Sequence, residues 1–168
     1  MIETSRLILI PLTYPQMLKY IKNDNSLEAE LKLNRTSMVI SPLLKEALEL
    51  SILPSLKDDK RNYLFSTLWT VIDKFENRSV ADVCFQGDPN EQGEIEIGYG
   101  TYEQFKGKGY MTEAVKCMTN WAAQQAKVKA VVAVTDKTNV GSFTVLVKNA
   151  FEKVSESEQQ FHWRLAVS

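Results

Sequence analysis

The spacing of hydrophobic and polar residues predicts helices in the first third of the chain and mainly strands in the remainder. Arg6–Leu12 is apolar and branched, and Pro11 cannot donate within a central strand, so this run predicts a short first strand. Apolar residues at helical spacing predict a helix over Pro15–Ile21, and one or two further helical turns over Leu27–Leu33. The chain is therefore expected to begin with one strand followed by helices.

A longer helix is expected before the strand-rich region. Ser41 offers an N-cap hydroxyl, and Pro42 suits the first helical position because its missing N–H would be unpaired there in any case. The pattern ends near Pro54. The apolar side of this helix comprises Leu43, Leu44, Ala47, Leu48 and Leu50.

From residue 62 onwards the pattern is that of strands. Tyr63–Asp73 and Ser79–Phe85 are rich in aromatic and β-branched residues and predict a β-hairpin. A loop of turn-forming residues leads to a third strand, Glu94–Tyr99, in which acidic and apolar residues alternate strictly. Its isoleucines and Tyr99 therefore face one side of the sheet, and its two glutamates face the other.

The last third of the chain predicts a helix, a buried strand, a short helix and a closing hairpin. This order indicates one α/β (α+β) domain over residues 1–168. The predicted elements run from the glycine-bearing loop described below to about Gln125, and over Lys129–Thr135, Asn139–Asn149, Phe151–Val154 and Phe161–Val167.

The composition is that of a globular protein, and it argues against two classes of partner. Of 168 residues, 44% are hydrophobic and 24% charged, with a formal net charge of −1. Nucleic-acid binding is disfavoured because it needs an excess of cationic side chains, and no apolar run approaches the roughly 18 residues of a membrane span. The first residues lack the basic and apolar regions of a signal peptide, so the expected location is the cytoplasm.

The cysteines and the histidine suggest neither a metal nor a redox site. Cys84 and Cys117 lack metal-ligand spacing and lie in apolar segments, so they are expected to be buried free thiols. His162 lies between Phe161 and Trp163, where a structural role is favoured over a triad or a metal site. No metal is expected.

A glycine-bearing loop, Gln104–Ala114, runs from a predicted strand into a predicted helix. Gly107 and Gly109 permit positive φ and close approach of a ligand, and the helix that follows presents unpaired N–H groups, which together favour a phosphate. The loop is not a P-loop, because Tyr102 stands at the first glycine position. Nor is it a Rossmann fingerprint, because the third glycine is missing.

Gln104, Gly107 and Gly109 instead form the pattern Gln-x-x-Gly-x-Gly between a strand and a helix. This pattern resembles the acyl-CoA pyrophosphate loop of the GNAT family of N-acetyltransferases. The resemblance covers roughly the C-terminal half of the chain. Within the family, the sequence is similar to the branch that includes the ribosomal-protein alanine acetyltransferases. The matching segments are Glu96–Tyr99, Gly107–Ala114, Asn139–Ser142, Val145–Phe151 and, less specifically, Thr4–Leu7.

The resemblance implies the fold of the family: a mixed, mainly antiparallel sheet of six or seven strands, flanked by helices on both faces and splayed open near the glycine loop. It also implies acetyl-CoA as co-substrate. Backbone N–H groups of about Lys106–Tyr110 would hold the pyrophosphate, with the Thr112 hydroxyl as a further donor. The strand ending at Gly98–Gly100 would pair with the pantetheine arm, and Asn139 would hydrogen-bond the arm or the thioester.

Some of these residues also have ordinary structural interpretations. Asn139 is a suitable N-cap for the helix that follows it, and Lys106 and Lys108 are equally well explained as solvated loop lysines. The full candidate set for binding the cofactor is Gly98, Tyr99, Gln104, Phe105, Lys106, Gly107, Lys108, Gly109, Tyr110, Thr112, Asn139 and Ser142.

Attack on a thioester requires a neutral amine, and therefore a nearby base. Glu96 is the first candidate because it stands where this branch of the family carries a glutamate, and it could act through a water; Glu94 is the second. Many members of the family place a tyrosine acid where this chain has Leu146, which leaves Ser142 or solvent to protonate the thiolate. Ala150 replaces a family glycine at a helix end, where Asn149 is expected to take the positive φ instead.

The function implied is transfer of an acetyl group from acetyl-CoA to a primary amine, either a protein N-terminus or a small amine, by direct attack in a ternary complex. The acceptor is expected near residues 23–50 and the predicted hairpin. A different class of function, a non-catalytic acyl-CoA-binding sensor or regulatory module, remains open because of Leu146 and Ala150. A monomer and a homodimer both remain open.

Overall fold

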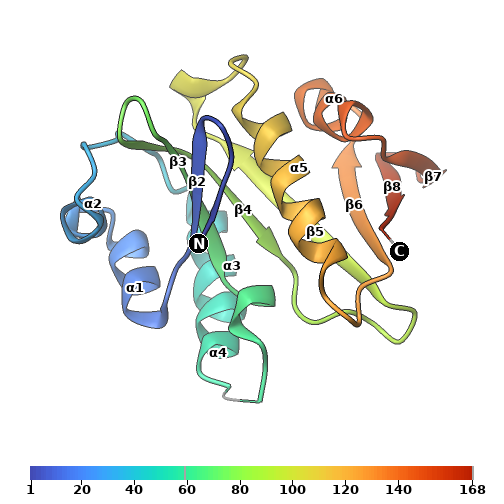
Figure 1. Cartoon of the computed structure of the whole chain (residues 1–168), viewed down its shortest axis with the longest axis horizontal. Coiled ribbons are helices and arrows are strands. Elements are labelled where there is room, and N and C mark those ends of the chain that lie inside the picture. Colours follow the sequence, from blue (N-terminus) through green and yellow to red (C-terminus); the bar gives the residue numbers. More distant parts are fainter. Residues whose placement is uncertain (59, 168) are drawn as a thin grey trace.

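A computed structural model describes residues 1–58 and 60–167 of the chain. In these residues eight strands form one sheet in the order β1-β2-β3-β4-β5-β6-β8-β7 (Figure 1). Neighbouring strands are antiparallel except for β5 and β6, which are parallel. The strands are β1 Ile2–Glu3, β2 Leu7–Pro11, β3 Leu68–Asp73, β4 Arg78–Phe85, β5 Glu94–Thr101, β6 Ala130–Asp136, β7 Glu152–Glu156 and β8 Gln160–Ala166.

The mixed, mainly antiparallel sheet is confirmed, but the predicted count of six or seven strands is wrong. The unexpected strand is β1, whose two residues pair with the middle of β2. Two residues carry no periodicity of their own, so pairing with another strand decides their conformation.

The helices cover both faces of the sheet (Figure 1). A π-helical stretch, Leu48–Ile52, joins α3 to α4, and short 3-10 helices lie at Tyr63–Phe65 and Glu103–Phe105. The α-helices are α1 Tyr14–Lys22, α2 Ser26–Leu31, α3 Pro42–Ala47, α4 Leu53–Leu56, α5 Tyr110–Ala123 and α6 Val140–Lys148.

Alternation along the central strands divides the core into two clusters. On β3, Trp69 and Val71 pack in the cluster that contains the apolar side of α5, whereas Leu68 packs with α1 and the π-helical stretch. Successive side chains of a strand point to opposite faces, so each of these strands supports a helical layer on either side. Figure 1 shows α5 crossing the sheet beside β5, while α1, α3 and α4 lie toward β2–β4.

The sheet opens near the glycine loop, as expected, and the opening lies between its two parallel strands. Glu94–Glu96 of β5 pair with Ala130–Val132 of β6, and beyond these positions the strands separate. β5 continues to Thr101 beside β4, and β6 continues to Asp136 beside β8. The opening therefore lies between the carboxyl ends of β5 and β6, just before the glycine loop.

The helix predicted from Ser41 is confirmed in its start but not in its end or its packing. The Ser41 hydroxyl accepts a hydrogen bond from the Leu44 N–H at 3.1 Å. The helix continues through Pro54 to Leu56, because the π-helical stretch places Pro54 near the start of a new helical segment, where no N–H is needed. Of the predicted apolar side only Leu48 is buried, whereas Leu43 is 77% exposed.

Three local predictions are corrected. The strand predicted from Tyr63 begins at Leu68, because the Asn62 side chain accepts from the Leu64 N–H and favours a 3-10 turn. Ala150 itself takes positive φ, at 62°, rather than Asn149. The two cysteines are free thiols, as expected, but both are only half-buried.

Candidate functional site

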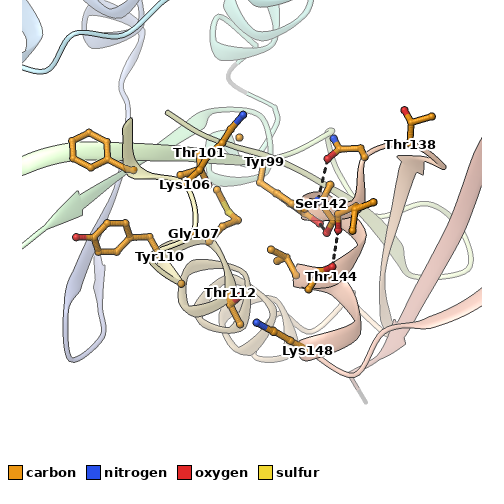
Figure 2. A pocket seen from close by; sticks show the side chains of 18 residues that line it. Tyr99, Thr101, Lys106, Gly107, Tyr110, Thr112, Thr138, Ser142, Thr144 and Lys148 are labelled. Atoms are coloured by element: carbon orange, nitrogen blue, oxygen red, sulfur yellow. Dashed lines mark hydrogen bonds between the residues drawn. The ribbon is translucent and has the colours of Figure 1, made fainter. Parts of the chain in front are cut away.

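A cleft of about 740 Å³ opens where β5 and β6 separate. One wall consists of the end of β5, the glycine loop and the first turn of α5, and the opposite wall consists of the segment from Thr138 into α6 (Figure 2). The predicted cofactor residues that line it are Tyr99, Phe105, Lys106, Gly107, Gly109, Tyr110, Thr112, Asn139 and Ser142.

The glycine loop has the backbone conformation that its glycines suggested. Gly107 and Gly109 adopt φ values of 76° and 78°, which a residue with a side chain takes only at a cost. Gly109 is the N-cap of α5, so the unpaired N–H groups and the positive dipole end of a 14-residue helix lie at the cleft. The arrangement can hold an anion with backbone groups alone.

Three of the predicted cofactor residues lie outside the lining of the cleft. The Gln104 side chain donates to the Ser37 carbonyl at 2.6 Å and so joins the loop to the segment between α2 and α3. The Lys108 ammonium lies 5.3 Å from the Phe105 ring centroid. Gly98 pairs in register with Cys84, and a Cβ added at Gly98 would lie 3.6 Å from the Cys84 sulfur.

Two hydrogen bonds fix the start of α6 across the opening. The Asn139 Oδ1 accepts from the Ser142 N–H at 3.1 Å, so the predicted N-cap role is confirmed. The Tyr99 hydroxyl of β5 donates to the Ser142 carbonyl at 2.8 Å (Figure 2). Burial raises the pKa of Tyr99 to about 12, so its phenol keeps its proton at neutral pH.

The structure adds cleft residues that the sequence analysis did not single out. Lys148 lies on α6, and in Figure 2 its side chain extends toward Thr112 on α5. Thr144 lines the same wall four residues earlier, on the same side of the helix. This spacing, within the predicted helix Asn139–Asn149 that also carries Ser142, was the signal that could have identified Lys148.

Neither candidate base lines the cleft. Glu94 forms an ion pair with Arg164 of β8 at 2.9 Å. Glu96 is half-buried, and its Oε1 accepts a hydrogen bond from the Gln86 side chain at 2.9 Å. Both lie on the face of β5 that also carries Gly98 and Gly100, opposite the isoleucines that pack against the α5 side of the sheet.

A third acidic residue, Asp82, lies on this same face. It pairs in register with Gly100, which lines the cleft, and its Oδ2 accepts hydrogen bonds from the hydroxyls of Tyr20 at 2.6 Å and Tyr102 at 2.8 Å. Burial raises the pKa of Asp82 to about 6, although both tyrosine hydrogen bonds lower it. Sequence reasoning missed it; the available signal was a single carboxylate within the apolar run Ser79–Phe85.

Leu146, which stands where a tyrosine acid was expected from the family resemblance, offers no proton donor. Leu146 is fully buried in the core beneath α6 and carries no exchangeable proton. Ser142 and Thr144, four and two residues before Leu146 on α6, carry hydroxyls and line the cleft.

Over residues 1–58 and 60–167, none of the helices has both the length and the apolar character needed to cross a membrane. The same residues contain no group of three or more histidine, cysteine and acidic side chains arranged to hold a metal ion.

Comparison with known proteins places this architecture in a family. The model of the acetyltransferase (GNAT) domain matches residues 6–152, most of the chain, so the protein belongs to the GNAT acetyltransferase family. The uncharacterized N-acetyltransferase YjdG of Bacillus subtilis (strain 168) is 35% identical over 95 residues, which are 56% of this chain and 56% of that relative. The match thus spans little more than half the length of that curated relative.

Solved structures share the fold over nearly the whole chain. The ribosomal-protein-S5-alanine acetyltransferase of Vibrio fischeri superposes with a TM-score of 0.68 at 17% identity, covering 99% of this chain and 96% of the other. A GNAT-family acetyltransferase of Bacillus anthracis gives 0.67 at 15% identity, covering 99% and 98%. At these identities the likeness shows the fold alone.

Proposed function

We propose that the protein transfers an acetyl group from acetyl-CoA to a primary amine by direct attack in a ternary complex. The observation that carries the proposal is the cleft at the sheet opening, where two glycines at positive φ lead into the start of α5. A helix start with free N–H groups suits the CoA pyrophosphate, and membership of the GNAT family supports the same ligand.

The phosphate end of the cofactor would lie on the glycine loop. N–H groups of Lys106–Tyr110 would donate to the pyrophosphate, with the Thr112 hydroxyl as a further donor. Lys148 from the opposite wall would add positive charge near the phosphates. Lys106 also lines the cleft, and its ammonium is paired with Glu103 at 2.6 Å.

The pantetheine arm would run along β5. Among the described residues, Ile97–Thr101 pair only with β4, so the backbone edge toward β6 is free to bond the amides of the arm. Asn139 uses its Oδ1 to cap α6, which leaves its Nδ2 as the group that would donate to the arm or the thioester.

The acetyl transfer needs one base and one site for the leaving thiolate. The amine nitrogen would attack the thioester carbon, the C–S bond would break, and the CoA sulfur would leave with the electron pair. The proton lost by the amine would pass to Glu96 through a water, because Glu96 lies on the face of β5 that also carries Gly98 and Gly100 but does not itself line the cleft. Ser142 or solvent would protonate the thiolate.

The amine acceptor would approach from the helical layer. The face of β4 and β5 that carries Asp82, Glu96 and the two glycines is turned toward α1 and the π-helical stretch, near residues 23–50. A protein N-terminus is one acceptor class, since the neighbour from Vibrio fischeri is named an alanine acetyltransferase of ribosomal protein S5. A small amine is the other.

A non-catalytic acyl-CoA sensor is the second candidate function. The observations that favour it are the fully buried Leu146 at the usual tyrosine position and the absence of both candidate glutamates from the cleft lining. Both functions require the same cofactor cleft and differ only in turnover.

The test is an acceptor screen that follows thiol release from acetyl-CoA. Wild type is compared with Glu96→Gln and Glu94→Gln, and with Glu91→Gln as a control on the exposed loop before β5. Loss of a general base is expected to lower turnover by about 10²-fold in Glu96→Gln. Equal turnover in wild type and Glu96→Gln would remove Glu96 as the base, and binding without turnover for any amine would favour the sensor.

A further inference from the structure

The segment Thr4–Arg6 packs against the glycine loop and the first turn of α5. Glu113 on α5 accepts hydrogen bonds from the Thr4 hydroxyl, from the Arg6 backbone N–H at 3.2 Å and from the Arg6 Nε at 2.7 Å. Two segments about 107 residues apart in the sequence are therefore joined by one carboxylate. The hydrogen bonds from Thr4 and Arg6 hold the pKa of Glu113 below its usual range despite its partial burial, so it stays ionised at neutral pH.

The other end of the Arg6 side chain reaches into the loop itself. Its Nη1 donates to the Lys108 carbonyl at 3.1 Å, and its guanidinium lies 5.1 Å from the centroid of the Tyr110 ring. An added Cβ on Gly109 would lie 3.5 Å from the Arg6 Nη2. Arg6 thus contacts Lys108 and Tyr110 on either side of Gly109, and it does so from outside the cleft lining.

Holding the Lys108 carbonyl orients the next peptide N–H. The peptide unit is planar and trans, so the Gly109 N–H points away from the carbonyl of Lys108, and hence away from Arg6. Gly109 lines the cleft, and its φ of 78° is a conformation that a glycine leaves easily. The hydrogen bond from Arg6 to the Lys108 carbonyl therefore holds this peptide, and with it the Gly109 N–H, in one orientation.

We propose that Arg6 is a positioning residue for the cofactor: by bridging Glu113 and the Lys108 carbonyl it holds the glycine loop with its N–H groups directed at the CoA pyrophosphate. This inference rests on the proposed function of the cleft. Arg6 also pairs the negative charge of Glu113, which would otherwise repel a phosphate at the start of α5. Through Arg6, the N-terminal segment Thr4–Leu7 would contribute to cofactor binding, a role that the family resemblance alone did not imply.

Arg6 could instead serve only to anchor the N-terminal segment, and a second residue provides the control that separates this role from cofactor positioning. Lys74 anchors the same segment, because its ammonium donates to the Thr4 carbonyl at 2.7 Å and pairs with Glu3 at 2.8 Å. Among the described residues, the hydrogen bonds and ion pairs of the Lys74 side chain go to Thr4 and Glu3 and none goes to the glycine loop. Lys74→Gln loosens the segment without removing the Arg6 bridge, and Arg6→Gln removes the bridge.

The experiment is calorimetric titration of CoA into wild type, Arg6→Gln, Arg6→Lys and Lys74→Gln, with thermal unfolding measured for each. Loss of a charge-assisted bridge is expected to raise the Kd of CoA about tenfold in Arg6→Gln. Arg6→Lys is expected to recover little, because one ammonium lacks the fork that reaches both partners. Lys74→Gln is expected to bind like wild type. In turnover, the KM for acetyl-CoA should rise while kcat and the KM for the amine stay unchanged.

The outcomes separate the two claims. If wild type does not bind CoA, the proposed function and this inference both fall. If wild type binds and Arg6→Gln binds equally well, or if Lys74→Gln loses as much affinity as Arg6→Gln, only the inference falls. Should Arg6→Gln not fold, Arg6→Lys carries the same test, since it keeps the charge beside Glu113 and loses the bridge.

Discussion

One buried carboxyl, Asp82, lies between apolar residues of β4 and accepts hydrogen bonds from two tyrosines. Burial raises its pKa to about 6, so the folded protein keeps this proton to a higher pH than the unfolded chain does. The stability that this group contributes is present below its ordinary pKa and is lost as the pH rises through the folded value. Asp82 therefore destabilises the protein at neutral pH, a cost often found where a residue serves a site.

Asp82→Asn is predicted to remove this dependence on pH. Between pH 4 and pH 7 the unfolding free energy of the variant, relative to wild type, should rise by on the order of 2 kcal/mol. Urea unfolding of both proteins at the two pH values measures this difference. Asp136→Asn is the contrasting variant, because hydrogen bonds from Thr138 lower the pKa of Asp136. The unfolding free energy of this variant, relative to wild type, should therefore change with pH in the opposite direction. An equal difference at both pH values would show that Asp82 has no raised pKa.

At the scale of elements, the end of α6 shows how contacts override local preference. Asn149 tolerates positive φ better than alanine does, yet Ala150 takes φ of 62°. The reason is that the Asn149 side chain donates to the Thr112 carbonyl at 3.1 Å and to the Val145 carbonyl at 2.9 Å, which holds Asn149 in place between α5 and α6. Ala150 therefore takes the left-handed conformation in place of Asn149.

Ala150→Gly is predicted to stabilise the protein. Relief of the left-handed strain should raise the unfolding free energy by about 1 kcal/mol. Ala123→Gly, at the exposed end of α5, is the matched control and should lower it by roughly 0.5–1 kcal/mol, because the helical alanine there has no strain to relieve. Chemical denaturation compares the two. A loss of stability in Ala150→Gly would mean that the positive φ carries no cost.

The sequence was informative where the physical signal is local. Strict alternation identified β5 and its two faces, and the two glycines before a helical pattern identified the loop that takes positive φ at the start of α5. Asp82 and Arg6 were missed as functional candidates because their roles depend on Tyr20, Tyr102 and the Lys108 carbonyl, which are distant in sequence. Helical periodicity likewise could not show that Leu43 would remain uncovered.

At the scale of the whole molecule, the cleft lies at the junction of two parts of the sheet. The two parts, β1–β5 and β6–β8, are joined at three register positions of β5 and β6, by the ion pair of Glu94 with Arg164, and through α6 by the hydrogen bond from Tyr99 to the Ser142 carbonyl. A ligand that contacts both the glycine loop and α6 adds interactions across this junction, and any ligand that binds only the folded state stabilises it. Acetyl-CoA is therefore expected to raise the melting temperature.

The most direct test of the central claim, that this cleft holds acetyl-CoA, is the melting temperature of wild type with and without the cofactor. At a hundred times Kd, binding adds about 2.7 kcal/mol and should raise Tm by roughly 5–10 °C. Lys148→Glu, which reverses a charge in the cleft wall, should show a smaller shift at the same concentration. No shift in wild type at millimolar acetyl-CoA would contradict the account, and an equal shift in Lys148→Glu would contradict the assignment of that wall to the phosphates.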